Sequence, residues 1–336
     1  MDKPVLTNGF PTLNRAYNSV FRKNALSIGL VVPLDAHHHS ATPDMSRHIE
    51  RARLVDELGF AALWLRDVPF NVPSFGDAGQ MYDPFVYLGL LSGLTRDIAL
   101  GVASVVLPLR HPAHVAKAAA SADQLSGGRV LLGVASGDRP EEYPALAMTH
   151  ADRGARFRDS LAYIRAMADA FPRHSGSYGK LEGGVDMLPK PVAGQIPILI
   201  TGGAQQTPDW VAQHGDGWMT YPRDVAQQAG LVRDYRARSE RAGLPGKPVM
   251  QSLYVDLVPD DVDPRPIHLG FRSGVRFLKT YLHALQDSGM NHVALNLRFN
   301  QADIEYTMKR LADALLPDFP TLVFPNPASP NQGHPS

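Results

Sequence analysis

IALGVASVVLPLRHPAHVAKAAASADQLSGGRVLLGVASG, residues 98–137, is the stretch of this sequence that decides the fold. Two apolar, β-branched runs, at 98–107 and 130–135, flank a helical segment. Pro112 suits the first turn of that helix, and Gly127 provides the left-handed backbone that ends one. The stretch therefore predicts two parallel strands joined by a helix.

Only small side chains follow the two predicted strands, at Ala103-Ser104 and at Ala135-Ser136-Gly137. In parallel sheets and barrels, ligands bind at the carboxyl ends of the strands. Small residues there let a flat, wide ligand lie against the backbone. They also relieve crowding inside a barrel, and this stretch alone leaves both readings open.

The same alternation continues along the chain in both directions. Apolar runs predict further strands at 25–32, 60–65, 196–201, 217–221, 248–258 and 292–297. Amphipathic segments predict helices at 45–58, 83–95, 153–171, 225–242, 275–287 and 304–315, with one more beginning after Thr207. Alternating strands and helices of this number are typical of a (β/α)8 TIM barrel.

Three segments do not follow this alternation of strands and helices. Residues 1–24 lack a period and predict an N-terminal arm, and 25–316 predict a single barrel domain. Within the barrel, the glycine-rich segment 175–190 predicts a β-hairpin insertion after the fourth helix. The proline-rich residues 317–336 predict a C-terminal tail.

Composition excludes several classes of protein. The chain has 336 residues, with 33 Lys plus Arg against 33 Asp plus Glu, so no net charge attracts nucleic acid or an anionic membrane surface. It has no cysteine, which excludes thiolate metal sites and cysteine nucleophiles. No signal peptide or membrane span is evident, and we expect a cytoplasmic protein. The consecutive histidines 37–39 favour a solvated loop over a metal site, because neighbours on one segment do not all face one ion.

Residues at the ends of two predicted strands are candidates for catalytic or binding roles. Arg66-Asp67 follows the second strand, where buried charges need partners or water. The alternative is an ion pair at the barrel rim that adds little stability. After the fifth strand, Thr201-Gly202-Gly203 leads into a helix that starts near Thr207, a pattern typical of a phosphate cradle but also of a plain tight turn.

Several of these segments resemble the bacterial luciferase-like superfamily of flavin-dependent oxidoreductases. The resemblance covers roughly residues 26–315. It is most specific in GVASVVLP (101–108), ADQLSGGR (122–129) and LGVASG (132–137), with support from DPF (83–85) and TPDWVAQHG (207–215).

The resemblance implies a (β/α)8 barrel that carries FMN, or alternatively the deazaflavin F420, at the carboxyl ends of the strands. Family members often have a cis non-proline peptide bond at the position of Ala103-Ser104, beside the isoalloxazine. By position, the implied cofactor-binding residues are Ala103, Ser104, Ser136, Gly137, Thr201, Gly202, Gly203, Thr207, Thr220 and Tyr221. Luciferases place an arginine on the fourth strand that is absent here, so Arg272 is the candidate for phosphate neutralisation, with Arg139 a weaker one.

The implied activity is an FMN-dependent oxidoreductase, a monooxygenase that uses reduced flavin and O2 on a small organic substrate. The alternatives are F420-dependent hydride transfer, a non-catalytic flavin-binding protein, and a flavin-independent barrel that acts on a phosphorylated metabolite. A homodimer and a separate flavin reductase are the implied partners. Arg66-Asp67 stands where luciferases have a histidine pair, so we do not expect light emission.

Within this activity, Arg66 and Asp67 are the candidate catalytic residues. Arg66 would stabilise negative charge on the flavin or on an anionic substrate, and Asp67 would orient Arg66 or move a proton. The loops 70–82 and 138–152 are candidate lids. The aromatic candidates for the substrate pocket, which core packing explains equally well, are Phe70, Phe75, Tyr82, Tyr143 and Trp218.

Overall fold

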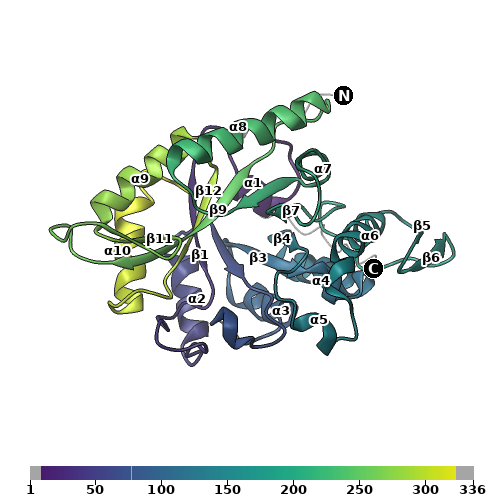
Figure 1. Ribbon diagram of the computed structural model, residues 1–336, viewed down its shortest axis with the longest axis horizontal. Helices are drawn as coiled ribbons and strands as arrows, with labels where there is room; N and C mark the ends of the chain where they lie inside the picture. Colours follow the sequence, from purple (N-terminus) through teal and green to yellow (C-terminus); the bar gives the residue numbers. More distant parts are fainter. Residues whose placement is uncertain (1–8, 77, 323–336) are drawn as a thin grey trace, which may run out of the picture.

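The computed structural model describes residues 9–76 and 78–322, and its centre is a closed barrel of parallel strands (Figure 1). Each barrel strand pairs in parallel with the next, and β8 pairs with β9 to close the sheet on itself. The predicted (β/α)8 barrel is therefore confirmed. Its strands are β1 Ser27–Val31, β2 Ala62–Leu65, β3 Ala99–Val106, β4 Val130–Ala135, β7 Ile198–Thr201, β8 Gly217–Thr220, β9 Val249–Leu257 and β12 His292–Asn296.

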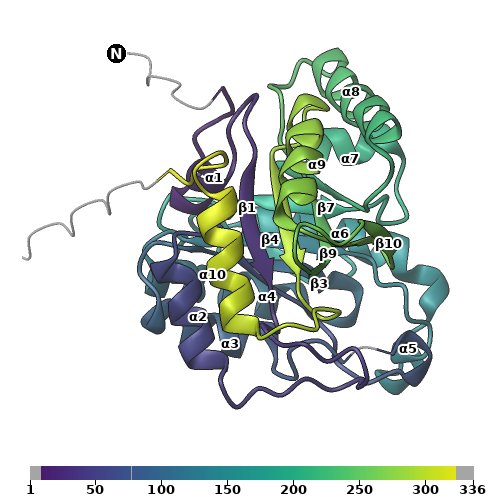
Figure 2. The same cartoon turned by 90° about the vertical axis from the view of Figure 1, so that its left-hand side faces the viewer.

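A helix follows each barrel strand and packs against the outside of the sheet (Figures 1 and 2). These helices are α2 His48–Glu57, α3 Pro84–Leu94, α4 Pro112–Ser126, α6 Arg153–Ala166, α7 Pro208–His214, α8 Val225–Arg241, α9 Val275–Asp287 and α10 Ile304–Leu315. In the stretch that predicted the fold, α4 begins at Pro112 and ends at Gly127, whose φ of 67° is left-handed. The apolar side chains between helices and sheet form the main core.

Short elements lie between the barrel units. They are α5 Glu142–Ala145 and the 3₁₀ turns η1 Pro73–Phe75, η2 Leu107–Leu109 and η3 His150–Asp152. The predicted insertion after α6 is a small hairpin, β5 Arg173–Gly176 with β6 Gly179–Glu182, which projects from the barrel (Figure 1).

A second hairpin, which the sequence analysis did not predict, interrupts the alternation after β9. It consists of β10 Arg265–Ile267 and β11 Gly270–Ser273, and β11 extends the sheet parallel to β9. Its segment is rich in proline and aspartate and lacks an apolar run, so it gave no strand signal. The hairpin lies directly on β9, because a Cβ added to Gly270 would come within 1.9 Å of the Tyr254 carbonyl oxygen.

The segment before β1 is more ordered than the expected arm. It contains α1 Arg15–Val20, which contacts β3 and β4. Phe10, Tyr17 and Phe21 are buried in one cluster with Trp64, whose side chain lies inside the barrel. The boundaries expected at residues 24 and 316 stay predictions, and 323–336 of the expected tail lie outside the described residues. No helix among the described residues has the length and apolar character to span a bilayer.

Candidate functional site

A cavity of about 800 Å³ opens at the carboxyl ends of the barrel strands. Its volume falls within the range of small-molecule sites, roughly 300–1,000 Å³. Most of the residues that the sequence analysis selected line this cavity. They are Arg66, Asp67, Ala103, Ser104, Ser136, Gly137, Thr201, Gly202, Gly203, Thr220 and Tyr221.

Small residues at the ends of β3 and β4 form part of the floor of the cavity. The Ala103–Ser104 peptide is cis, as the resemblance implies, and the β3–β4 register shifts between Val102 and Val105. The Ser104 and Thr201 hydroxyls hydrogen-bond to each other across the floor. Below it, Gly101 leaves room for the Trp64 ring, which would lie 2.3 Å from an added Cβ. The barrel interior is thus filled beneath the cavity and open above it.

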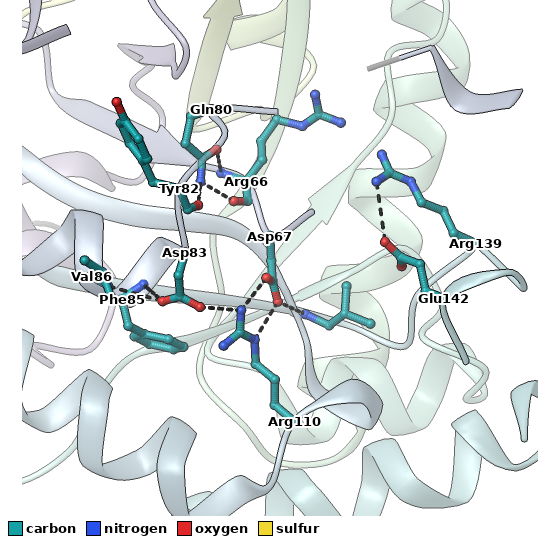
Figure 3. Close-up of polar contacts among 11 residues, drawn as sticks. Arg66, Asp67, Gln80, Tyr82, Asp83, Phe85, Val86, Arg110, Arg139 and Glu142 are labelled. Atoms are coloured by element: carbon teal, nitrogen blue, oxygen red, sulfur yellow. Dashed lines mark hydrogen bonds and ion pairs between the residues drawn. The ribbon is translucent and has the colours of Figure 1, made fainter. Parts of the chain in front are cut away.

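Asp67 lines the cavity and is part of a buried ion pair with Arg110 (Figure 3). Its carboxylate accepts from Arg110 Nη2 at 2.7 Å and Nε at 3.0 Å, and from the Val106 amide at 3.0 Å. Arg110 Nη2 also reaches Asp83 at 2.8 Å. Burial by itself would lower the pKa of Arg110, but the two carboxylates outweigh burial and raise it. Asp67 therefore positions the chain after β2 by holding Arg110, a partner that the sequence analysis did not select.

Arg66 is held by its backbone, while its side chain lines the cavity. The Gln80 side chain accepts from the Arg66 amide at 2.8 Å and donates to the Arg66 carbonyl oxygen. In Figure 3 the Arg66 guanidinium extends away from Asp67 and toward the side of the cavity where Arg139 lies. In this arrangement the Asp67 carboxylate binds Arg110 and the Val106 amide, and Arg66 stays the candidate catalytic cation.

A buried carboxyl of the loop 138–152 also lines the cavity and was missed by the sequence analysis. The Glu142 side chain is 2% exposed and lies 3.7 Å from Arg139 Nη1. Burial raises the pKa of Glu142, and the Arg139 charge offsets only part of that effect. The Arg139 guanidinium in turn lies 5.0 Å from the centre of the Phe75 ring. The two predicted lid loops therefore contact each other over the cavity.

The loop between β7 and α7 forms a backbone cradle. Gly202, Ala204 and Gln205 have φ angles of 56°, 46° and 59°, and positive φ in Ala and Gln is uncommon outside functional loops. A Cβ added to Gly203 would meet only the Gln206 carbonyl oxygen, at 3.7 Å, so the cradle is open on that side. Successive backbone amides in such turns form anion-binding concavities.

Polar groups from the start of α6 complete this end of the cavity. Arg153 Nη1 donates to the His150 carbonyl oxygen at 3.0 Å, and both side chains line the cavity beside Gln205. Within the described residues, His150 Nε2 and Arg153 Nε are buried and have no hydrogen-bond partner. Two such donors beside a backbone nest fit a bound phosphate. No sequence motif marked them, because they come from a loop and a helix start far from β7.

Two of the predicted cofactor residues do not line the cavity. The Thr207 hydroxyl caps α7 by accepting from the Trp210 amide at 3.2 Å. Arg272 lies on β11 and donates to Asp256 at 2.6 Å. The unpredicted hairpin sets Arg272 alongside β9 and outside the cavity lining, whereas Arg153 lines the cavity.

The aromatic side chains around the cavity also differ from the expected set. Phe75 lines it, whereas Tyr143 donates its hydroxyl to the Ser136 carbonyl oxygen, and Trp218 Nε1 donates to the Gly202 carbonyl oxygen at 2.9 Å. Phe70 and Tyr82 are exposed outside the lining. The rings that line the far wall are Tyr254, His268 and Phe299.

Known proteins resemble this chain in sequence and in fold. The family model described as luciferase-like monooxygenase matches residues 26–313. An uncharacterized protein of Mycobacterium tuberculosis is 33% identical over 228 residues, which is 62% of this chain and 79% of that protein.

Two solved structures share the fold. An F420-dependent secondary alcohol dehydrogenase in complex with an F420-acetone adduct matches with a TM-score of 0.71 and 16% identity, over 87% of this chain and 98% of that one. The oxygenating constituent of 3,6-diketocamphane monooxygenase from Pseudomonas putida, in complex with FMN, matches with a TM-score of 0.69 and 14% identity, over 89% of this chain and 100% of that one.

Proposed function

Because the chain belongs to the luciferase-like monooxygenase family, and is therefore an oxidoreductase, we propose that it is an FMN-dependent monooxygenase. It would use reduced flavin and O2 on a small organic substrate. The observation that carries the proposal is the anion cradle at one end of a cavity into which the ends of β3 and β4 present only small residues, Ala103-Ser104 and Ala135-Ser136-Gly137.

The residues of the cavity fit such a cofactor. Its phosphate would lie between the backbone of Gly202 and Gly203 and the buried donors of His150 and Arg153. Its ring would rest on the β3 and β4 ends, where Ala103 and Ser104 leave the backbone exposed to a planar group. Ser136, Gly137, Thr220 and Tyr221 line the space between, as the resemblance implies.

When bound, reduced flavin supplies the electrons that activate O2. The chain's own part is to orient the substrate, to exclude water and to balance charge. Arg66 places a cation in the cavity wall, and the loops 70–82 and 138–152 cover it through the Arg139–Phe75 contact at 5.0 Å.

F420-dependent hydride transfer is the second candidate. It is favoured by the F420-acetone adduct in a solved structure with the same fold. F420 also carries a phosphate, so the same cradle fits either cofactor, and cofactor titration separates the two candidates.

The test is to titrate the purified protein separately with FMN and with F420 and to follow binding by the absorbance and fluorescence of each. We expect FMN to bind and Arg153→Gln to weaken it at least tenfold, because the phosphate loses a charged partner. Arg241→Gln is the control, since it removes an exposed charge at the end of α8, outside the cavity lining. Binding of F420 alone would favour hydride transfer, and binding of neither would reject both.

We also propose that the protein is a homodimer supplied with reduced flavin by a separate reductase. The outer face of α3 supports the dimer, because Val86 and Leu90 on successive turns are 74% and 42% exposed. Light scattering of the wild type and of Val86→Glu tests this proposal, and a monomeric wild type would reject it.

A further inference from the structure

Arg66 comes directly after the paired part of β2. The register of β1 and β2 ends at Val31 and Trp64, and the register of β2 and β3 ends at Leu65 and Val102. Arg66 thus lies just past the ladder that fixes the strand, while its side chain lines the cavity.

The Gln80 side chain takes the part of a strand partner at Arg66 (Figure 3). Its Oε1 accepts from the Arg66 amide at 2.8 Å, and its Nε2 donates to the Arg66 carbonyl oxygen. Nε2 also donates to the Tyr82 carbonyl oxygen at 3.1 Å. The reversed orientation would set the NH2 group against the Arg66 amide, so these contacts fix how the side chain lies. Gln80 is 1% exposed, and water therefore does not compete for the three hydrogen bonds.

The segment 79–83, which carries Gln80, lies directly on the strand end. A Cβ added to Gly79 would come within 2.9 Å of Val68 Cγ2 and 3.6 Å of Arg66 Cβ. Gly79 also has a φ of 66°, which glycine adopts without strain. The close approach and the left-handed backbone both require glycine here, so the chain before Gln80 is fitted to the residues after β2.

The same segment is anchored a second time through Asp83. Asp83 caps the start of α3 and binds Arg110 at 2.8 Å. Arg110 in turn binds Asp67, the residue after Arg66. The segment therefore holds two consecutive residues of the strand end, Arg66 directly through Gln80 and Asp67 through Arg110 (Figure 3).

We propose that Gln80 is a positioning residue for Arg66, and that the loop 70–82 sets the place of the cavity cation through it. Gln80 is not among the described residues that line the cavity, so its effect on a bound molecule passes through Arg66. The proposal rests on the proposed function, in which Arg66 is the candidate catalytic cation. Loss of the Gln80 contacts keeps this charge but lets it shift, and a displaced charge acts less on a reaction.

The test compares Gln80→Met, Arg66→Ala and the double variant, because methionine keeps the length of the side chain and removes its hydrogen bonds. The first readout is hydrogen exchange at the Arg66 amide, measured without cofactor. We expect protection in the wild type and exchange about tenfold faster in Gln80→Met, since one buried hydrogen bond is worth roughly that factor. Gln227→Met is the matched control, an exposed glutamine of α8 that is not among the described lining residues.

The second readout is the rate at which O2 oxidises bound, photoreduced FMN to FMN and H2O2. We expect Gln80→Met to slow this step about threefold or more and to change FMN affinity less than about twofold. We expect the double variant to be as slow as Arg66→Ala alone, because the effects of residues that act through one another do not add. A residue that only supports the fold would lower the melting temperature and leave the rate of the folded protein unchanged.

An unprotected Arg66 amide in the wild type, an unchanged rate in folded Gln80→Met, or additive losses in the double variant would overturn the proposal. An unaltered rate in Arg66→Ala would also overturn it, because Gln80 would then position a residue without a part in the reaction. A wild type that binds no FMN would instead reject the proposed function. The Arg66 amide exchange needs neither cofactor nor turnover, so it keeps the two failures apart.

Discussion

The indole Nε1 of Trp64 donates a hydrogen bond of 2.8 Å to Nε2 of His292 inside the barrel. This contact leaves the His292 proton on Nδ1, which faces the Ser27 hydroxyl at 2.7 Å, and that hydroxyl donates to the Val20 carbonyl oxygen at 2.6 Å. The neutral ring thus links β2, β12, β1 and α1. Burial lowers the pKa of His292 to about 3.

The lowered pKa of His292 predicts a loss of stability in acid. Between the lowered pKa of about 3 and the ordinary value of 6.5, the unfolded chain binds a proton that the folded chain does not. The free energy of unfolding therefore falls as the pH drops below 6.5, by up to about 1.4 kcal/mol per pH unit. Urea denaturation at pH 7 and pH 5 measures this slope, and His292→Gln should flatten it. An equal slope in the variant would show that His292 does not cause the loss of stability in acid.

Substitution of Asp67 should lower stability, whereas substitution of its neighbour Arg66 should slow turnover. Asp67→Ala removes the bidentate partner of Arg110 and leaves only the Asp83 contact, so we expect a loss near the lower end of the roughly 3–5 kcal/mol that a broken buried pair costs. Arg66→Ala should keep stability within about 1 kcal/mol and retain flavin, but slow turnover. Thermal melts and steady-state rates of both variants check this contrast. An unaltered rate for Arg66→Ala would make Arg66 a structural residue of the rim.

Gly203 should tolerate a side chain for folding but not for cofactor binding. A Cβ there meets only the Gln206 carbonyl oxygen at 3.7 Å, and a larger side chain would fill the cradle. We expect Gly203→Val to keep the melting temperature and to weaken FMN at least tenfold. Gly184→Val is the control, since nothing lies within 4 Å of a Cβ at this position. An unchanged FMN affinity would remove the β7–α7 loop from the site.

Arg129 of the family-like segment 122–129 should be a stability residue. Its guanidinium is buried and donates to the carbonyl oxygens of Ser92, Thr95 and Ile98. Burial lowers the pKa of Arg129 to about 10. A lysine has no planar fork, so Arg129→Lys should cost about 3 kcal/mol or more without affecting FMN affinity. Denaturation and FMN titration of the variant measure both quantities, and a loss of FMN affinity in the folded variant would contradict this view.

Glu142 should oppose stability at high pH. Its pKa is raised by burial, so the folded chain holds the proton to a higher pH than the unfolded chain, and the free energy of unfolding falls as the pH rises through this window. Glu142→Gln removes the ionisation and should raise the melting temperature more at pH 8 than at pH 5. Melts of both proteins at the two pH values measure the difference. The opposite order would mean that the ion pair with Arg139 dominates.

The barrel was predictable because its signals are local. The spacing of apolar residues and the helix ends at Pro112 and Gly127 are set by neighbouring residues. Because two consecutive parallel strands need a crossover between them, residues 98–137 already determined one β-α-β unit. The β10–β11 hairpin and α1 were not predictable in this way. Their pairing depends on contacts with β9 and with the barrel interior rather than on their own pattern.

By itself, the sequence determined the barrel and which residues end its strands, and closure of the barrel brings those ends together whatever the loops do. That is why Ala103, Ser136 and Gly202 share one cavity. Only the tertiary structure decided that His150 and Arg153 meet the β7–α7 loop, and that Asp67 is held by Arg110. These side chains come from loops and helix starts far apart in the chain, and short-range periodicity carries no information on where such segments converge.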